Sequence, residues 1–195
     1  SIEKALQFLK NLQYPTGGFA QVYPARGNYS DYVTFNDNAM VNVLDLLDQI
    51  AARDYPFDNG LISDQQQQEI KASINSAIDY ILKAQIKVDG KLTAWCAQHD
   101  PETYEPQQAR AYEHPSISGS ESIGVIRYLM SRPQTEEIRQ AVEAALEWFD
   151  ESKLENTDYI SADPNEEYFV EKQGATTWYR FYDIKTNKGI FSGRD

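Results

Sequence analysis

The chain has 195 residues, 41% of them hydrophobic, and its 18 Lys and Arg against 30 Asp and Glu give a net charge of −12 at pH 7. This composition excludes intrinsic disorder and collagen-like structure, and the length fits one domain with a real core. Nucleic acid is excluded as a partner because phosphate binding needs a basic surface, and the charge alone also argues against a polyanionic sugar.

Apolar residues spaced three and four apart predict five helices along the chain. The first ends near Gln13 and the second lies between 36 and 53. The third runs from Asp64, which can cap it, to about 82, with its apolar face at 70, 74, 78, 81 and 82. The fourth starts at Ser118 or Ser120, and the fifth follows Thr135 as its cap. No apolar run reaches transmembrane length, so a membrane partner is not expected.

A short internal repeat links three of these helices. Ala5–Leu9, Ala77–Ile81 and Ala145–Phe149 resemble one another, and the first two copies are each followed by a glutamine eight residues after the alanine, Gln13 and Gln85. In both cases a polar loop and a second helix come next. A repeating helix–loop–helix unit predicts a mainly α fold of the α/α toroid type, with coincidence as the alternative.

Long loops separate the helices, at 14–35, 86–117 and 174–195. Two of them carry turn signals, Val88–Lys91 and Lys185–Gly189, which predict short β-hairpins. Long ordered loops on a helical base are where binding and catalytic residues tend to lie.

The run around Asp37 offers oxygen ligands at the start of the second helix. Asp37 with Asn36 and Asn38 could hold a hard cation such as Ca²⁺, although the order of residues is not that of an EF-hand. The alternative is an ordinary helix N-cap, since Asn and Asp satisfy the first backbone N–H groups.

Other reactive side chains have plainer interpretations. The histidines His99 and His114 have no zinc-ligand spacing, and Cys96, the single cysteine, lies in an apolar run typical of a buried, inert thiol. Ser118–Glu121 is better explained as a capped helix start than as a nucleophile motif.

Three loop arginines are candidates for binding a carboxylate. Arg110 lies in the second long loop, and Arg180 and Arg194 lie in the last one. Each could simply be a solvated charge or a partner for one of the many acids. Together they could line one cleft, where planar guanidinium groups bind carboxylates through two hydrogen bonds.

At these residues the sequence resembles the catalytic domain of the family 10 polysaccharide lyases, the pectate lyases with an α/α toroid fold. The similar stretches follow one another over almost the whole chain: Gln21–Pro24, Tyr29–Tyr32, Thr34–Asn38, Leu92–His99, Ala109–Glu113, Ser118–Ser122, Trp178–Asp183 and Gly189–Asp195. No single stretch is specific, but their number and order make the resemblance specific.

The resemblance implies β-elimination in α-1,4-linked polygalacturonate. Arg110 matches the family's arginine base, Asp37 a calcium-ligand aspartate, and Arg194 an arginine that binds a substrate carboxylate; Arg180, His99 and Trp95 are further cleft residues. The implied cofactor is Ca²⁺, whose charge would make the C5 proton more acidic. The implied location is secreted or periplasmic.

The family's catalytic domain is longer than this chain. It has further helices before the first one here, including a segment with a second calcium-ligand aspartate that has no counterpart in this sequence. Residues 1–195 are therefore interpreted as one domain, part of a pectate lyase catalytic domain.

Two other functions remain open. The first is a non-catalytic polyuronate-binding protein, because a ligand segment is missing. The second is an inverting glycoside hydrolase on an α/α toroid, for which Glu113 and Glu121 could serve as the two carboxylates.

Overall fold

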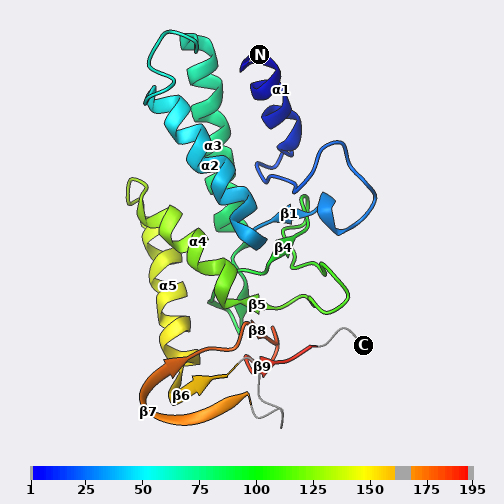
Figure 1. The fold of residues 1–195 in the computed structure, drawn as a ribbon, viewed down its shortest axis with the longest axis vertical. Helices are drawn as coiled ribbons and strands as arrows, with labels where there is room; N and C mark the ends of the chain where they lie inside the picture. Colours follow the sequence, from blue (N-terminus) through cyan, green and yellow to red (C-terminus); the bar gives the residue numbers. More distant parts are fainter. Residues whose placement is uncertain (1, 161–167, 193–195) are drawn as a thin grey trace.

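The structure, a computed structural model, describes residues 2–160 and 168–192 and is mainly helical (Figure 1). The described residues form five α-helices: α1 Ile2–Leu12, α2 Ala39–Ala52, α3 Asp64–Ala84, α4 Gly119–Met130 and α5 Glu136–Ser152. Two short 3₁₀ helices precede α2: η1 Tyr29–Asp31 in the first long loop and η2 Asn36–Asn38 directly after that loop. All five predicted helices are thus present.

Local hydrogen bonds explain where two of the helices begin. Thr135 caps α5 as expected, because its side chain accepts a hydrogen bond from the backbone N–H of Ile138. The cap of α3 is Ser63 and not Asp64: Ser63 Oγ accepts from the N–H of Gln66, and the Gln66 side chain accepts in return from the N–H of Ser63. This reciprocal pair is a capping box, and it satisfies two backbone donors at the start of α3.

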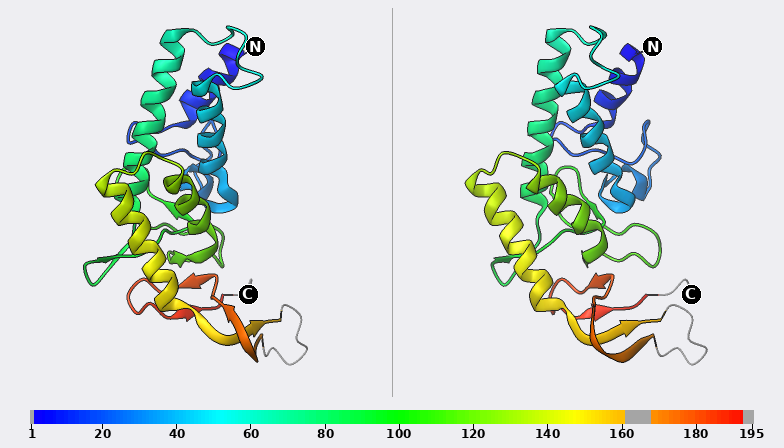
Figure 2. Two further views of the ribbon diagram at one scale, coloured as in Figure 1. Left: turned by 90° about the vertical axis from the view of Figure 1, so that its left-hand side faces the viewer. Right: turned by 60° about the vertical axis from the view of Figure 1, so that its left-hand side comes forward.

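The helices form an open stack of two layers (Figures 1 and 2). α3 packs against α2 and α5, and α4 packs against α5 and α2, so α2 and α4 make one layer while α3 and α5 make the other. The described helices do not close into a ring, which leaves the α/α toroid as a prediction for a longer assembly of helices. None of the described helices is long and apolar enough to cross a bilayer.

The two repeated glutamines have the same structural role. Gln13 Nε2 donates to the carbonyl of Ser73 in α3 at 3.0 Å and to Gly17 O at 2.9 Å. Gln85 Nε2 donates to the carbonyl of Ala141 in α5 at 2.8 Å and to Thr93 O at 2.8 Å. Gln13 thus ties the end of α1 to α3, and Gln85 ties the end of α3 to α5, so the sequence repeat is a structural repeat.

Short strands repeat in the same way. The strands are β1 Val33–Thr34, β2 Lys87–Val88, β3 Lys91–Leu92, β4 Gln98–His99, β5 Ile117–Ser118, β6 Leu154–Tyr159, β7 Phe169–Thr177, β8 Phe181–Tyr182 and β9 Gly189–Ile190. β1 precedes α2 and pairs with β4, which follows α3; β5 precedes α4 and pairs with β8, which follows α5. These two small sheets lie where α2 and α4 begin.

The two predicted hairpins are confirmed, as β2–β3 and β8–β9. The sequence did not predict the longest pair, β6–β7, which packs below α5 in Figure 1. Its register shifts between Glu155 and Thr157, and most of its side chains are exposed or half-buried. The strict alternation that signals a strand is therefore absent.

Candidate active site

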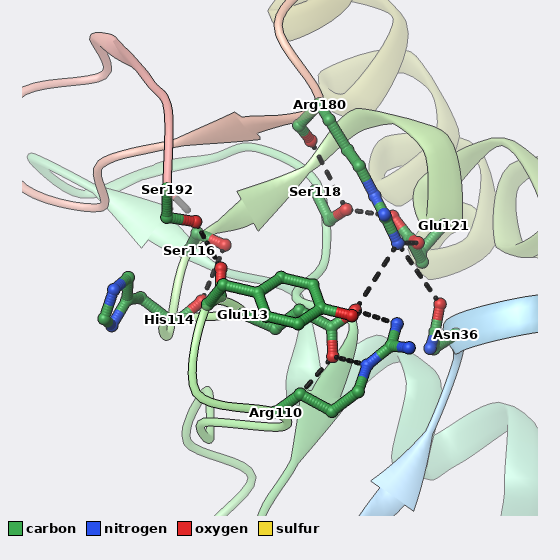
Figure 3. A network of polar contacts seen from close by, with 10 residues as sticks. Asn36, Arg110, Glu113, His114, Ser116, Ser118, Glu121, Arg180 and Ser192 are labelled. Atoms are coloured by element: carbon green, nitrogen blue, oxygen red, sulfur yellow. Dashed lines mark hydrogen bonds and ion pairs between the residues drawn. The ribbon is translucent and has the colours of Figure 1, made fainter. Parts of the chain in front are cut away.

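Four chain segments meet at the beginning of α2 and α4 (Figure 3). Arg110 lies in the loop between β4 and β5, and Arg180 directly precedes β8. Glu121 lies in the first turn of α4, and Asn36 begins η2 just before α2. The pairing of β5 with β8 brings Arg180 next to α4, because Arg180 O accepts hydrogen bonds from Gly119 N and Ser118 Oγ.

Arg110 is bound by a buried carboxylate three residues later. Arg110 Nε donates to Glu113 Oε2 at 2.8 Å, Arg110 Nη2 pairs with Glu113 Oε1, and the backbone N–H of Arg110 donates to Glu113 Oε2 at 3.2 Å. The side chain of Glu113 is 1% exposed, whereas that of Arg110 is 43% exposed. The Arg110 guanidinium is therefore partly exposed to solvent, while the carboxylate that binds it is buried.

Arg180 has a similar arrangement on a second acid. Arg180 Nη2 lies 2.8 Å from Glu121 Oε1, and Glu121 is buried and accepts a hydrogen bond from Ser118 Oγ. The same Nη2 lies 3.5 Å from Asn36 Oδ1 and 3.8 Å from Glu113 Oε1. The two arginines are thus joined through Glu113 into one network, which is drawn in Figure 3.

The ion pair between Arg110 and Glu113 raises the pKa of the arginine and lowers the pKa of the carboxyl. The hydrogen bonds that Arg110 donates to Glu113, followed by the negative charge of Glu113, raise the pKa of the Arg110 guanidinium above its ordinary value. The hydrogen bonds and charge of Arg110 lower the pKa of the Glu113 carboxyl, and Arg180 adds to this effect. Glu113 is therefore ionised at neutral pH and cannot serve as the protonated general acid that an inverting hydrolase needs.

Both arginines keep donors for a further acceptor. Arg110 uses Nε and Nη2 and Arg180 uses Nη2, and among residues 2–160 and 168–192 no hydrogen-bond partner occupies Nη1 of either group. Their guanidinium groups also lie over the rings of Tyr112 and Phe181, at 5.0 and 4.8 Å, which limits their motion. Two exposed guanidinium groups held in this way can receive carboxylates.

Asp37 is the candidate calcium ligand, and its backbone is unusual. Asp37 and Asn38 both adopt left-handed conformations, with φ of 53° and 56°. Neither side chain caps α2, and within the described part of the chain the exposed Asp37 carboxylate has no hydrogen-bond or ion-pair partner. Asn38 occupies the N-cap position of α2, but the expected side-chain cap is absent, and the Asp37 carboxylate remains available to a ligand.

The described residues do not complete a calcium site. Ca²⁺ takes six to eight oxygen ligands. In the ranges that the structure covers, no group of three or more His, Cys, Asp or Glu side chains could hold a metal ion. Asp37 could supply one carboxylate, and the other ligands would have to come from elsewhere.

Two of the predicted cleft residues are core residues instead. Trp95 is 0% exposed, and its Nε1 donates to Ile81 O at 2.8 Å. His99 is also 0% exposed; its Nε2 accepts from Cys96 N at 2.9 Å and its Nδ1 donates to Tyr104 O at 2.8 Å. Burial lowers the pKa of His99 to about 4, so the ring is neutral. Neither side chain can touch a substrate in this structure.

The repeat gives the physical reason for the error at Trp95. Ser118 N donates to Trp95 O just as Thr34 N donates to Phe19 O, and Phe19 is buried as well. Both aromatic residues fill the space under a strand that precedes α2 or α4. A pattern shared with a family therefore marked a packing position here.

Three further predictions can be placed. Cys96 is buried, and burial raises the pKa of its thiol, which confirms an inert cysteine. Ser118 is the residue before α4, although its hydroxyl pairs with Glu121 and not with a backbone N–H. Arg194, predicted to bind a substrate carboxylate, lies outside the described residues.

The sequence-based prediction missed how the arginines are held. It offered Glu113 and Glu121 as hydrolase acids, and Asn36 as a neighbour of a cation ligand. The spacing of Arg110 and Glu113 could have indicated a local ion pair, whereas the contact of Arg180 with Glu121 joins residues 59 positions apart. Only the pairing of β5 with β8 explains that contact.

Comparisons with known proteins agree with this arrangement. Residues 1–195 match the family described as Pectic acid lyase. Two solved structures, a family 10 polysaccharide lyase from Cellvibrio cellulosa and an aspartate-to-alanine mutant of such a lyase from that organism in complex with trigalacturonic acid, are each 48% identical, with a TM-score of 0.92. The similarity covers 98% of this chain but 60% of each of those chains. A comparison with curated protein sequences gave no match.

The family match extends from the first residue to the last and includes every segment that contributes to the arginine network. The fold similarity is equally extensive on this chain's side. The chain therefore belongs to the pectic acid lyase family, and its fold is that of the family 10 polysaccharide lyases.

Proposed function

We propose that this chain carries the arginine side of a pectate lyase site, which cleaves α-1,4-polygalacturonate by β-elimination. The observation that supports this most directly is the pair of exposed guanidinium groups, Arg110 and Arg180, fixed on the buried carboxylates of Glu113 and Glu121. Since each sugar unit of the substrate carries a carboxylate, such a pair suits it well.

In the proposed reaction Arg110 takes the proton from C5 of one galacturonate unit. The electrons of the C5–H bond form the C4–C5 double bond, and those of the C4–O bond leave with the glycosidic oxygen, which then takes up a proton. Arg180 binds the uronate carboxylate and stabilises the negative charge that develops beside C5. The products are a shortened chain and an unsaturated uronide.

The ion pair sets a condition on this step. Arg110 bound to Glu113 is protonated, and the raised pKa keeps it so at neutral pH. It can accept the C5 proton only after losing one of its own. We therefore expect the activity to rise with pH through the alkaline range.

The proposal includes Ca²⁺ only because Asp37 could supply one of its oxygen ligands. The chain spans 60% of the length of the solved lyases that it matches, so the remaining ligands would lie in parts that this chain does not include. We also propose a secreted or periplasmic location, where the polymer is accessible.

A hollow beside Arg180 gives room for further sugar units. It has a volume of about 660 Å³ and is bounded by Arg180, Tyr112 and a group of aromatic side chains, among them Phe169, Trp178, Tyr179 and Phe191. Since Arg180 borders both the network and the hollow, a chain bound at the arginines can continue into it.

The test is an assay of the full-length protein on polygalacturonate, with ultraviolet absorbance reporting unsaturated ends. We expect product from the wild type, and a loss of at least about 100-fold on Arg110→Ala, which removes the proposed base. The circular dichroism spectrum should not change, because Arg110 lies in the loop between β4 and β5 and outside the helices. Unchanged turnover in the variant would contradict the role of Arg110.

The same assay separates the two alternatives. Binding of polygalacturonate without any unsaturated product would indicate the non-catalytic protein, which the shorter span of this chain keeps open. Reducing ends without unsaturated ends would indicate a hydrolase, which the burial of the Glu113 and Glu121 carboxylates behind their arginines disfavours.

A further inference from the structure

Contacts with one residue, Glu113, hold the segment that carries Arg110. Besides the three contacts between Arg110 and the Glu113 carboxylate, Glu113 N donates to Arg110 O at 2.8 Å and Ala109 N donates to Glu113 O at 3.0 Å. Five interactions with one residue thus fix both the backbone and the side chain of Arg110. The carboxylate itself is almost fully buried, so it cannot move away without opening the loop.

The same carboxylate also faces the second arginine. Glu113 Oε1, which pairs with Arg110, lies 3.8 Å from Arg180 Nη2. Arg180 comes from a different part of the chain and is held by Glu121 from its other side. Glu113 therefore lies between the two guanidinium groups, as Figure 3 shows.

We propose that Glu113 is a positioning residue of the lyase, which fixes the Arg110 and Arg180 guanidinium groups at a set separation so that both act on the same uronate unit. This inference rests on the proposed function. Glu113 does not itself touch the substrate, because its side chain is covered. A displacement of about 1 Å in a catalytic group can cost about 100-fold in rate, so a fixed base matters greatly.

Glu113 also sets the protonation of Arg110. The groups that face Arg110 are the Glu113 carboxylate, the rings of Tyr112 and Tyr29 and, across Glu113, the Arg180 guanidinium. Glu113 is the strongest of these influences and raises the pKa of Arg110. A neutral residue at position 113 would therefore lower that pKa.

The experiment compares Glu113→Gln with Glu136→Gln in the full-length protein. Glu136 pairs with Arg139, also three residues away, but both side chains are more than half exposed and lie outside the network. We expect Glu113→Gln to lower kcat about 10- to 100-fold while KM stays within about twofold, because the loss of positioning outweighs the larger neutral fraction of Arg110 that the lower pKa gives. Glu136→Gln should match the wild type.

The pH profile separates positioning from a purely structural role. In the wild type, kcat should rise with pH across the alkaline range; in Glu113→Gln it should level off at a lower pH. Glu113→Asp retains the charge, so it should lose rate but retain the wild-type shape. An unchanged kcat in Glu113→Gln, or an equal loss at every pH together with a lower melting temperature, would overturn the proposal.

A second readout does not need activity. Nuclear magnetic resonance of the guanidinium Nε–H groups reports whether an arginine is held, and we expect a slowly exchanging Arg110 signal in the wild type that is lost in Glu113→Gln. If the wild type gives no unsaturated product, the lyase proposal fails while this signal still tests the positioning. An Arg110 signal that is equally protected in the variant would refute it.

Discussion

At the scale of single residues, His99 couples folding to pH. Its ordinary pKa is 6.5, and burial lowers this to about 4 in the folded protein. Between pH 6.5 and about pH 4, His99 is therefore protonated in the unfolded chain but neutral in the folded protein. This contribution of His99 to stability is complete above pH 6.5 and is lost progressively as the pH falls from 6.5 to 4. It amounts to roughly 3 kcal/mol, at about 1.4 kcal/mol for each pKa unit.

We expect the free energy of unfolding, measured with urea, to fall by roughly 2 kcal/mol from this residue alone between pH 7 and pH 5. In His99→Gln that part of the pH dependence should disappear, whereas His114→Gln, at an exposed loop position, should retain it. If His99→Gln does not fold, direct titration of the imidazole by nuclear magnetic resonance measures the same pKa. A value near 6.5 would contradict the prediction.

Asp37 provides a second test at this scale. Asparagine tolerates the left-handed backbone that Asp37 adopts, so Asp37→Asn removes the charge without disturbing the turn. If Asp37 binds Ca²⁺, the variant should need about tenfold more Ca²⁺ for half-maximal lyase activity, since each lost ligand charge weakens the site.

Asp89 offers a matched control for Asp37. It also has a positive φ, of 49°, but it lies in the turn of the β2–β3 hairpin. Asp89→Asn should leave the Ca²⁺ dependence unchanged. Chelator titrations that coincide for wild type and Asp37→Asn would mean that Asp37 does not bind the ion.

At the scale of the elements, the repeated glutamines hold neighbouring helices together. Gln85 is 5% exposed and makes two hydrogen bonds, one to α5 and one to the strand region after α3. Gln85→Ala would remove the hydrogen bond to the buried Thr93 carbonyl and the contact with Ala141 O, which links Gln85 to α5. We expect a loss of about 1–3 kcal/mol in the free energy of unfolding by urea.

The control is Gln65→Ala, which truncates an exposed residue in the first turn of α3. It should change the free energy of unfolding by less than about 0.5 kcal/mol. Equal losses in the two variants would show that the link between the helices adds nothing.

Gly124 joins α4 to the turn at Asp37. A Cβ atom at Gly124 would lie 2.1 Å from Asn38 Oδ1, closer than any real contact, whereas a Cβ at Gly119 in the same helix would make ordinary contacts at 3.5 Å and beyond. Gly124→Ala must therefore push the Asn38 side chain aside. We expect a net cost of up to about 1 kcal/mol in stability, because the displaced atom is the end of an exposed side chain and alanine itself favours the helix.

Gly119→Ala is the internal control for this effect. It should be neutral or slightly stabilising, by up to about 1 kcal/mol, because alanine favours the helix. Thermal unfolding of both variants measures the difference. A Gly124→Ala protein as stable as Gly119→Ala would mean that the turn next to Asp37 adjusts freely.

At the scale of the whole molecule, local patterns predicted the elements better than their roles. The helices were predictable because one apolar face of each packs against a neighbour, as with Ile70 and Ile74 of α3, which are buried. The β6–β7 hairpin was not, since both its faces are largely exposed and no apolar alternation results. Tertiary pairing, as of Arg180 with Glu121, leaves no local signal.

The same limit applies to the net charge of −12. It argued against a polyanionic sugar, but it averages over the whole surface, whereas the guanidinium groups of Arg110 and Arg180 lie beside the same carboxylate. Their buried partners, Glu113 and Glu121, count toward the total yet face away from solvent. Net charge therefore says little about what such a site binds.

The position of the helix-linking glutamines has a different residue at the end of α5. The third copy of the repeat, in α5, has Lys153 at the position that Gln13 and Gln85 occupy. Instead of reaching a carbonyl of another helix, Lys153 pairs with Asp150 and Glu155 beside the β6–β7 hairpin. An amide can donate to a helix carbonyl in a buried contact, whereas an ammonium group is strongly hydrated and favours acidic partners near the surface. Among the described residues, the same position of the repeat thus links two helices to a later one and forms a local ion-pair cluster after the third.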